Sequence, residues 1–205
     1  MKVIGITGSI GMGKSTAADM LRDMGVPVHD SDAAVHRLLA AGGAAVVAVG
    51  KVFPEAVKAD SAGQRYIDRA ILGQTVFFDR HKKKTLEDIL HTLVQAESDQ
   101  FIALMQENGH DLAALDIPLL FETGAEKRVD MTLCVSAPPE VQRMRVMERH
   151  GMTSEKFDQI VAGQLPDAEK RRRAGYVLDS GQDLDGMRRE LSEIIAAMRA
   201  EKPAL

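Results

Sequence analysis

The sequence predicts a three-layer α/β fold with a parallel sheet. Short apolar, β-branched stretches alternate with longer segments of helix-forming residues, the order typical of a parallel sheet with helices on both faces. A glycine-rich turn at residues 8–15 joins the first expected strand to the first expected helix. Two intervals, residues 33–107 and 138–174, are instead mostly helical, so we expect them to be insertions. The α/β core would then consist of residues 1–32, 108–137 and 175–205.

The glycine-rich turn has the sequence GSIGMGKS and fits the pattern G-x-x-x-x-G-K-S, which is that of a phosphate-binding loop. Residues 2–7 before it are mostly apolar and β-branched, as in a buried strand, and residues 16–24 after it are good helix formers without proline. The motif therefore lies between a strand and a helix. That context places bound phosphate at the positive end of a helix dipole.

Each residue type in this loop has a chemical reason. Glycines at positions 8, 11 and 13 allow backbone conformations that a Cβ would block, so that main-chain N–H groups can point at phosphate oxygens. Lys14 can reach the β- and γ-phosphates, and the Ser15 hydroxyl can ligate Mg²⁺. We therefore expect ATP with Mg²⁺ here. The predicted ATP-binding residues are Gly8, Gly11, Met12, Gly13, Lys14, Ser15 and Thr16.

Composition excludes several classes of protein. The 205 residues are 45% hydrophobic and 27% charged, which is ordinary for a soluble globular protein. A net charge of −4 argues against general attraction to nucleic acid or an anionic membrane. The single cysteine, Cys134, permits no internal disulfide and fits a reducing compartment. With no signal peptide and no long apolar run, we expect a cytoplasmic protein. A monomer or small homo-oligomer is expected.

Two carboxylates follow the second expected strand, at Asp30 and Asp32. In open α/β sheets ligands bind beyond the carboxyl ends of strands, so we expect both near the phosphate loop. One of them would act as general base toward a hydroxyl or help to position Mg²⁺. Alternatively, Asp30-Ser31-Asp32 caps a helix at residues 33–40. The two roles are compatible.

Residues 33–107 separate the second expected strand from the third. This interval is too long for one ordinary crossover between strands, so we expect it to form a helical subdomain. Further helices are predicted at residues 44–53, 67–78 and 86–106, with a turn at 60–63. We interpret the lysine run at 82–84 as solvated surface, and His91 as a structural residue among apolar neighbours.

A third core strand, residues 111–117, carries Asp116 near its end. An acid there either serves the magnesium side of the site, meets the substrate, or is only a strand-terminal polar residue. After a strand at 130–136, a basic helical pair precedes the last strand at 176–179. Such a pair is typical of a lid that closes over the transferring phosphate.

In the first of the two basic helices, Arg145 and Arg149 are four residues apart, so we expect them to share one helix face. A second helix is expected at 154–164, capped by Ser154. Most of the basic run at residues 170–173 is interpreted as solvated surface. The chain would end in an amphipathic helix at 187–199.

These features favour a small-molecule kinase over two other classes. A GTPase switch is expected to carry the guanine motif N-K-x-D, and no such string occurs. A non-catalytic ATP-binding module would lack the pair of aspartates beside the loop. Another small-molecule or nucleoside monophosphate kinase with the same loop remains open.

The ordered set of motifs resembles dephospho-CoA kinases over roughly residues 3–181. The matching strings are IGITGSIGMGKST, GVPVHDSD, IDR followed by LG and VF, LHTLV, PLLFE, PE-x-Q with Arg145 and Arg149 after it, then Gln164 and DS. The loop alone is shared by many nucleotide-binding proteins, whereas the ordered set is much more specific. Three positions depart from the family pattern: Thr92 for proline, Gly175 for aspartate and Ser180 for asparagine.

The resemblance implies transfer of the ATP γ-phosphoryl group to the ribose 3′-hydroxyl of dephospho-CoA. By matching position, Asp32 would be the general base and Arg145 the lid residue, with Lys14 and Ser15 on the ATP and magnesium side. The residues implied on the acceptor side are Asp32, Arg69, His91 and Asp116. Of the departures, Thr92 would affect how rigidly His91 is held, and Gly175 and Ser180 would affect adenine-side contacts.

Overall fold

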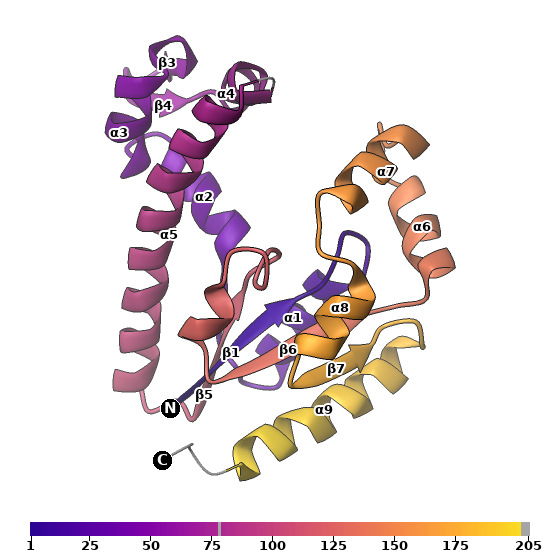
Figure 1. The fold of residues 1–205 in the computed structure, drawn as a ribbon. Helices are drawn as coiled ribbons and strands as arrows, with labels where there is room; N and C mark the ends of the chain where they lie inside the picture. Colours follow the sequence, from indigo (N-terminus) through magenta and orange to yellow (C-terminus); the bar gives the residue numbers. More distant parts are fainter. Residues whose placement is uncertain (78, 202–205) are drawn as a thin grey trace. The chain divides into compact units, whose positions relative to one another are not determined.

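The protein is described by a computed structural model covering residues 1–77 and 79–201. The chain divides into two compact units, Met1–His29 with Leu104–Leu205 (unit 1) and Asp30–Ala103 (unit 2). Unit 1 is built on a five-stranded sheet in the order β2-β5-β1-β6-β7 (Figure 1). The predicted α/β fold class is confirmed.

The strands of this sheet are short and their buried faces are apolar. They are β1 (Lys2–Thr7), β2 (Val28–Asp30), β5 (Leu112–Asp116), β6 (Met131–Ser136) and β7 (Tyr176–Asp179). β1 pairs in parallel with β5 and β6, and β6 pairs in parallel with β7. The carboxyl ends of parallel strands lie at one edge of the sheet, so the loop after β1 lies beside Asp116, whose partner in the β1–β5 register is Ile6.

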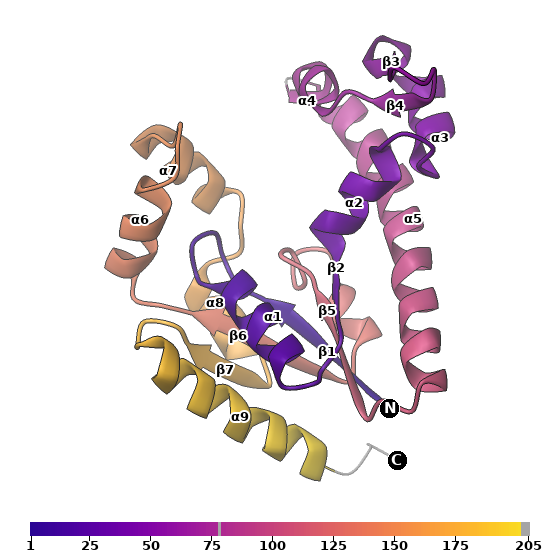
Figure 2. The same ribbon diagram turned by 180° about the vertical axis from the view of Figure 1, so that it is seen from behind.

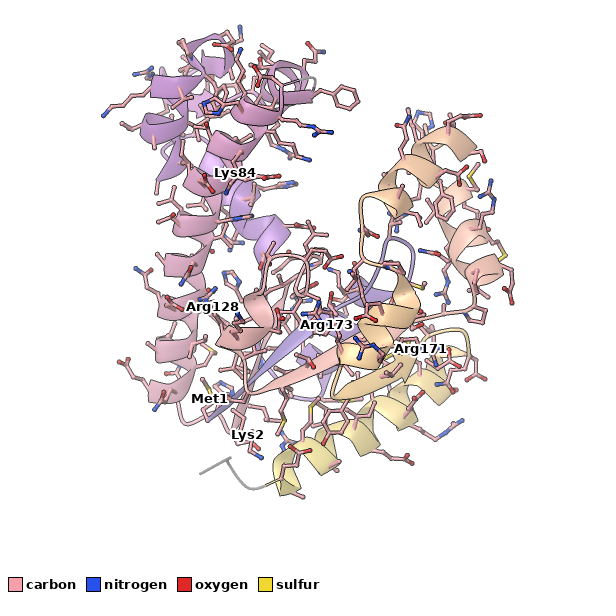
Figure 3. The ribbon with its side chains drawn as sticks, viewed as in Figure 1. Met1, Lys2, Lys84, Arg128, Arg171 and Arg173 are labelled. Carbon is pink, nitrogen blue, oxygen red and sulfur yellow. The ribbon has the colours of Figure 1, made fainter. Side chains whose placement is uncertain are left out.

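Helices cover both faces of the sheet. α1 (Lys14–Asp23) and α9 (Leu184–Ala200) pack together and share one apolar core with the strands. α8 (Asp167–Arg173) lies against β6 on the other face (Figure 1, Figure 2). The start of β1 is tied to the end of α9, where Lys2 Nζ donates to the main-chain oxygen of Met198 at 2.6 Å (Figure 3). A cation at that position also offsets the negative end of the helix dipole.

The predicted basic helical pair is present, with shifted ends. α6 (Pro139–Met147) and α7 (Ser154–Ala162) follow β6 and pack on each other. The prediction that Arg145 and Arg149 share a helix face is wrong, because α6 ends before Arg149. Ser154 is not the cap of α7 either: the Thr153 hydroxyl accepts from the Lys156 N–H at 3.3 Å. Threonine with an extended backbone is also among the preferred helix caps.

Unit 2 is helical with one small hairpin. Its elements are α2 (Ser31–Leu39), α3 (Ala45–Val52), the 3₁₀ turn η1 (Pro54–Ala56), β3 (Val57–Ala59), β4 (Arg65–Ile67), α4 (Arg69–Phe77) and α5 (Arg80–Glu107). The helix predicted at 67–78 therefore starts too early, since Ile67 pairs with Val57 in the hairpin; Phe78 lies outside the described residues. The predicted turn at 60–63 is confirmed and is closed by the Asp60 carboxylate, which accepts from the N–H groups of Ala62 and Gln64 at 2.9 Å.

Two further interpretations are settled by burial. The lysine run at 82–84 is exposed on α5, as predicted (Lys84 is labelled in Figure 3). Cys134 is buried in β6, and burial raises the pKa of its thiol to about 12. This cysteine therefore stays protonated at neutral pH and behaves as a small apolar side chain.

No helix within the described residues has the length and apolarity needed to cross a membrane.

The basic run of α8 is only partly solvated. Arg171 and Arg172 are exposed, but Lys170 is 0% exposed. Lys170 Nζ lies 2.9 Å from Glu122 Oε1 and donates to the Pro118 carbonyl at 3.1 Å. The prediction that most of this run is solvated is thus confirmed, and Lys170 is the exception, because one turn of α8 faces β6 and the segment that follows Asp116.

The pKa of Glu122 reflects this pairing. Burial alone would raise it, but hydrogen bonds from Lys170 and from the Leu165 N–H outweigh that effect and hold the pKa below its ordinary value. A carboxyl group with a lowered folded-state pKa stabilises the fold at neutral pH. This contribution is lost as the pH falls through the acidic range.

Replacing Lys170 by methionine is expected to lower the free energy of unfolding by about 3 kcal/mol, the lower end of the range for breaking a buried ion pair, because Glu122 keeps some contact with water. Urea unfolding at pH 7 measures the change. The double variant Lys170→Met/Glu122→Gln is the matched control and should recover part of the loss, since no buried carboxylate is left without its cation. A loss below about 1 kcal/mol in the single variant would contradict a buried charged pair.

Candidate active site

The loop after β1 has the backbone shape that its glycines were expected to provide. Gly11 and Gly13 have positive φ angles of 76° and 80°, and Gly13 directly precedes α1. Gly8 is required for a different reason, because a Cβ there would lie 2.6 Å from the Val135 carbonyl oxygen. The loop is thus pressed against β6 at its start and turns sharply at its end.

Lys14 and Asp116 meet at the carboxyl edge of the sheet. Lys14 Nζ lies 2.5 Å from Asp116 Oδ1, and the two side chains are 16% and 5% exposed. Lys14 opens α1, while Asp116 ends the neighbouring strand β5. The structure therefore brings together two residues that the sequence placed at the ATP side and at the acceptor or magnesium side.

The magnesium prediction rests on the chemistry of the donors. Ser15 is exposed in the first turn of α1, one residue after Lys14. Among residues 1–77 and 79–201, no group of three or more histidine, cysteine or acidic side chains is placed to hold a metal ion. Mg²⁺ bound to a nucleotide needs only one or two protein ligands, because phosphates and water supply the rest. A single hydroxyl beside a phosphate loop fits that requirement.

Met12 acts in the loop through packing. Its side chain is 2% exposed, and its sulfur accepts from the Ala137 N–H at 3.1 Å. The thioether therefore faces the core, and the main-chain groups of Met12 are engaged as well: its N–H donates to the Ser9 carbonyl at 3.1 Å and its carbonyl accepts from the Ser180 hydroxyl. Thr16 is half-buried in the first turn of α1.

Arg145 is held beside the loop by Ser180. Its Nη1 and Nη2 donate to the hydroxyl and the carbonyl of Ser180 at 3.1 and 2.7 Å. The Ser180 hydroxyl in turn donates to the Met12 carbonyl at 2.8 Å. Arg145 comes so close to the loop that a Cβ on Gly13 would lie 3.6 Å from its Nη1. A cation from α6 is therefore placed next to the residue that precedes Lys14.

Four residues that the sequence suggested for the site lie in unit 2. Asp30 caps α2, its carboxylate accepting from the Ala33 N–H at 2.9 Å, so the capping interpretation is confirmed for Asp30. Asp32 is exposed in the first turn of α2. Arg69 is exposed at the start of α4, and His91 is exposed on α5. The interpretation of His91 as a structural residue among apolar neighbours is wrong, because it lies on the solvated side of α5.

The positions that depart from the family pattern differ in importance. Thr92 keeps α5 continuous, and its hydroxyl donates to the Asp88 carbonyl at 2.9 Å. Ser180 belongs to the loop contacts described above. Gly175 lies at the opposite edge of the sheet, where its N–H donates to Thr132 Oγ1 at 2.9 Å. The expected effect of Gly175 on adenine-side contacts is therefore not supported.

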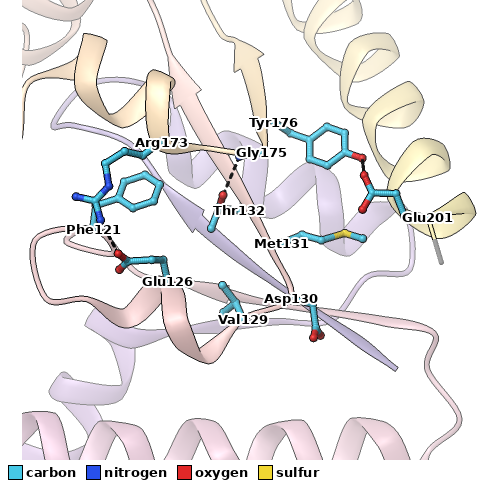
Figure 4. A pocket seen from close by; sticks show the side chains of 10 residues that line it. All are labelled: Phe121, Glu126, Val129, Asp130, Met131, Thr132, Arg173, Gly175, Tyr176 and Glu201. Atoms are coloured by element: carbon cyan, nitrogen blue, oxygen red, sulfur yellow. Dashed lines mark hydrogen bonds and ion pairs between the residues drawn. The ribbon is translucent and has the colours of Figure 1, made fainter. Parts of the chain in front are cut away.

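A pocket of about 360 Å³ lies at the amino ends of β6 and β7, away from the loop (Figure 4). Several of its polar groups already have partners: Arg173 bonds Glu126 and stacks on Phe121 at 4.6 Å, Tyr176 bonds Glu201, and Asp130 accepts from the Val3 N–H. None of the predicted site residues lines it. We therefore place the candidate active site at the carboxyl edge of the sheet.

Comparison with known proteins shows which family the chain belongs to. A family model described as dephospho-CoA kinase matches residues 2–185. The chain belongs to the dephospho-CoA kinase family. It is 50% identical to a dephospho-CoA kinase of Mesorhizobium japonicum over 202 residues, which is 98% of this chain and 99% of the relative.

Solved structures extend the family comparison to the fold. A Thermus thermophilus crystal structure is 38% identical with a TM-score of 0.81, covering 96% of this chain and 97% of that one. A dephospho-CoA kinase from Campylobacter jejuni has a TM-score of 0.72 at 24% identity, covering 96% of each chain. The second likeness concerns the fold alone, and it agrees with the α/β architecture in Figure 1.

Proposed function

We propose that this member of the family transfers the γ-phosphoryl group of ATP to the ribose 3′-hydroxyl of dephospho-CoA, giving CoA and ADP. This is the last step of CoA biosynthesis. The observation that carries the proposal is the glycine-rich loop with Lys14, Asp116 and Arg145 around it, in a chain matched by the family model over residues 2–185. Phosphoryl transfer requires mainly positioning and charge neutralisation, which such a loop supplies.

On the nucleotide side, main-chain N–H groups within residues 8–16 and the Lys14 ammonium would bind the phosphates of ATP. Lys14 would exchange its bond to Asp116 for phosphate oxygens, which leaves the carboxylate available for the magnesium side or for the acceptor. The Ser15 hydroxyl would ligate Mg²⁺. When bound, Mg²⁺ neutralises charge on the β- and γ-phosphate oxygens.

On the acceptor side, Asp32 would accept the proton of the 3′-hydroxyl as that oxygen attacks the γ-phosphorus. Its exposure in the first turn of α2 leaves the carboxylate accessible, while Asp30 fixes the start of that helix. Arg69 and His91 would bind dephospho-CoA.

The chain divides by role in the same proposal. Residues 1–32, 108–137 and 175–205 would form the nucleotide-binding core, residues 33–107 the acceptor subdomain and residues 138–174 the lid. The partners are then ATP and dephospho-CoA, for a monomer or small homo-oligomer. A single cysteine and no disulfide suit the reducing cytoplasm.

Acceptor choice tests the proposal. ADP release from MgATP should be stimulated strongly by dephospho-CoA and only weakly by adenosine, AMP or shikimate. Stimulation by another acceptor would support phosphoryl transfer from ATP at the loop but would show that dephospho-CoA is not the substrate. Absence of stimulation by any acceptor would contradict the proposed transfer.

Arg145→Ala is expected to lower kcat by about a hundredfold and to change KM for dephospho-CoA by less than about threefold, since a cation beside the transferring phosphate acts mainly in the transition state. Steady-state kinetics at saturating MgATP measure both constants. Arg149→Ala is the matched control, because Arg149 is exposed beyond the end of α6, and it should behave like wild type. Equal effects of Arg145→Ala on kcat and KM would argue against this role.

A further inference from the structure

Two glutamine side chains bind the main chain of Ile10, at the tip of the phosphate loop. Gln142 Nε2 donates to the Ile10 carbonyl at 2.8 Å, and Gln164 Oε1 accepts from the Ile10 N–H at 3.1 Å. Gln142 lies on α6 and is 7% exposed. Gln164 lies in the short segment between α7 and α8. Both glutamines belong to strings that resemble the family, and neither has a role in the proposal above.

The two contacts come from the two ends of the segment that contains helices α6 and α7. Gln142 comes from the start of the pair and Gln164 from just beyond its end. Gln164 is itself held in place, because the adjacent Leu165 N–H donates to Glu122 Oε1 at 2.8 Å. On the other side, α6 touches the loop so closely that a Cβ on Gly11 would lie 3.0 Å from the Gln142 carbonyl. The tip of the loop is thus held from two directions.

The direction of each hydrogen bond is determined by the main chain. A peptide N–H can only donate and a carbonyl oxygen can only accept. Gln142 must therefore present its NH₂ group to Ile10, and Gln164 must present its oxygen. The two side chains are chemically identical, yet they have opposite roles at one residue.

We propose that Gln142 and Gln164 are positioning residues that hold the phosphate loop in its anion-binding shape and in register with Arg145, one helical turn along α6 from Gln142. Donors that are fixed before a charged ligand arrives bind it more tightly than donors that must first be ordered. The inference rests on the proposed function only in taking this loop as the site of MgATP.

The variants Gln142→Glu and Gln164→Glu test the proposal as a matched pair. Each is nearly isosteric and adds one negative charge beside the same main-chain residue. At pH 8 a glutamate is ionised and only accepts hydrogen bonds. Gln164→Glu therefore keeps the acceptor for the Ile10 N–H, whereas Gln142→Glu sets a carboxylate against the Ile10 carbonyl.

We expect Gln142→Glu to weaken MgATP binding by about tenfold or more and Gln164→Glu by less than about threefold, because loss of one buried hydrogen bond with an opposed acceptor corresponds to at least a factor of ten. Isothermal titration calorimetry with MgATP and no acceptor gives the dissociation constant, so the result does not depend on the identity of the acceptor. The kcat/KM for ATP should fall in parallel.

Three outcomes would overturn the inference. Equal weakening in both variants would assign the effect to the added charge. Unchanged affinity in both would show that the glutamines do not support the loop. A lower Tm in Gln142→Glu with unchanged MgATP affinity would make that side chain a structural residue only. If wild type binds MgATP but does not phosphorylate dephospho-CoA, the proposed function fails while this inference is still tested.

Discussion

Lys14→Ala is expected to lower kcat by about a thousandfold, since it removes a positioned cation from the phosphates that gain charge in the transition state. The structure adds a second consequence. Lys14 Nζ lies 2.5 Å from Asp116, whose side chain is 5% exposed, so the alanine variant also deprives a buried carboxylate of this cation. We therefore expect a lower Tm together with the loss of turnover.

The double variant Lys14→Ala/Asp116→Asn separates these two effects. It should recover much of the Tm, because the neutral amide needs no cation, while turnover stays low. Lys84→Ala, at an exposed lysine on α5, is the surface control and should leave both quantities unchanged. Turnover close to wild type in Lys14→Ala would remove Lys14 from the mechanism.

Asp32→Asn is expected to lower kcat by about a thousandfold, within the range for loss of a general base, and to change the dissociation constant of MgATP by less than about threefold. Asparagine has almost the same shape but cannot take the proton of the attacking hydroxyl. Single-turnover kinetics with saturating MgATP and dephospho-CoA measure the chemical step directly.

Asp30→Asn is the matched control, two residues away. The Asp30 carboxylate accepts from the Ala33 N–H, and asparagine is an equally good cap, so this variant should keep turnover near wild type. A fall in MgATP affinity without a change in the chemical step would place Asp32 on the magnesium side. Equal losses in both variants would point to the start of α2 as a structural element.

The parts of the fold that follow from local sequence were predictable. The loop sequence identifies its own position between β1 and α1, and apolar runs identify the core strands. The β3–β4 hairpin in unit 2 was missed because its strands have three residues each, too few to show an alternating pattern.

The contacts around the loop were not predictable for a different reason. Lys170 belongs to a run of four basic residues, and nothing in that run marks the one side chain that faces β6. Gln142, Gln164 and Ser180 carry no local sequence signal, because their partners are 35 to 168 positions away or are main-chain groups. Resemblance to the family singles out these positions, but only the geometry gives them a role.

The central claim is that a phosphoryl group passes from ATP to the 3′-hydroxyl of dephospho-CoA. The most direct measurement incubates the purified protein with MgATP and dephospho-CoA and identifies the product by ³¹P NMR and mass spectrometry. Equimolar ADP and CoA, with the new phosphate on the ribose 3′-oxygen, is the result we predict. ADP without CoA, or a phosphate on another oxygen, would contradict the assignment.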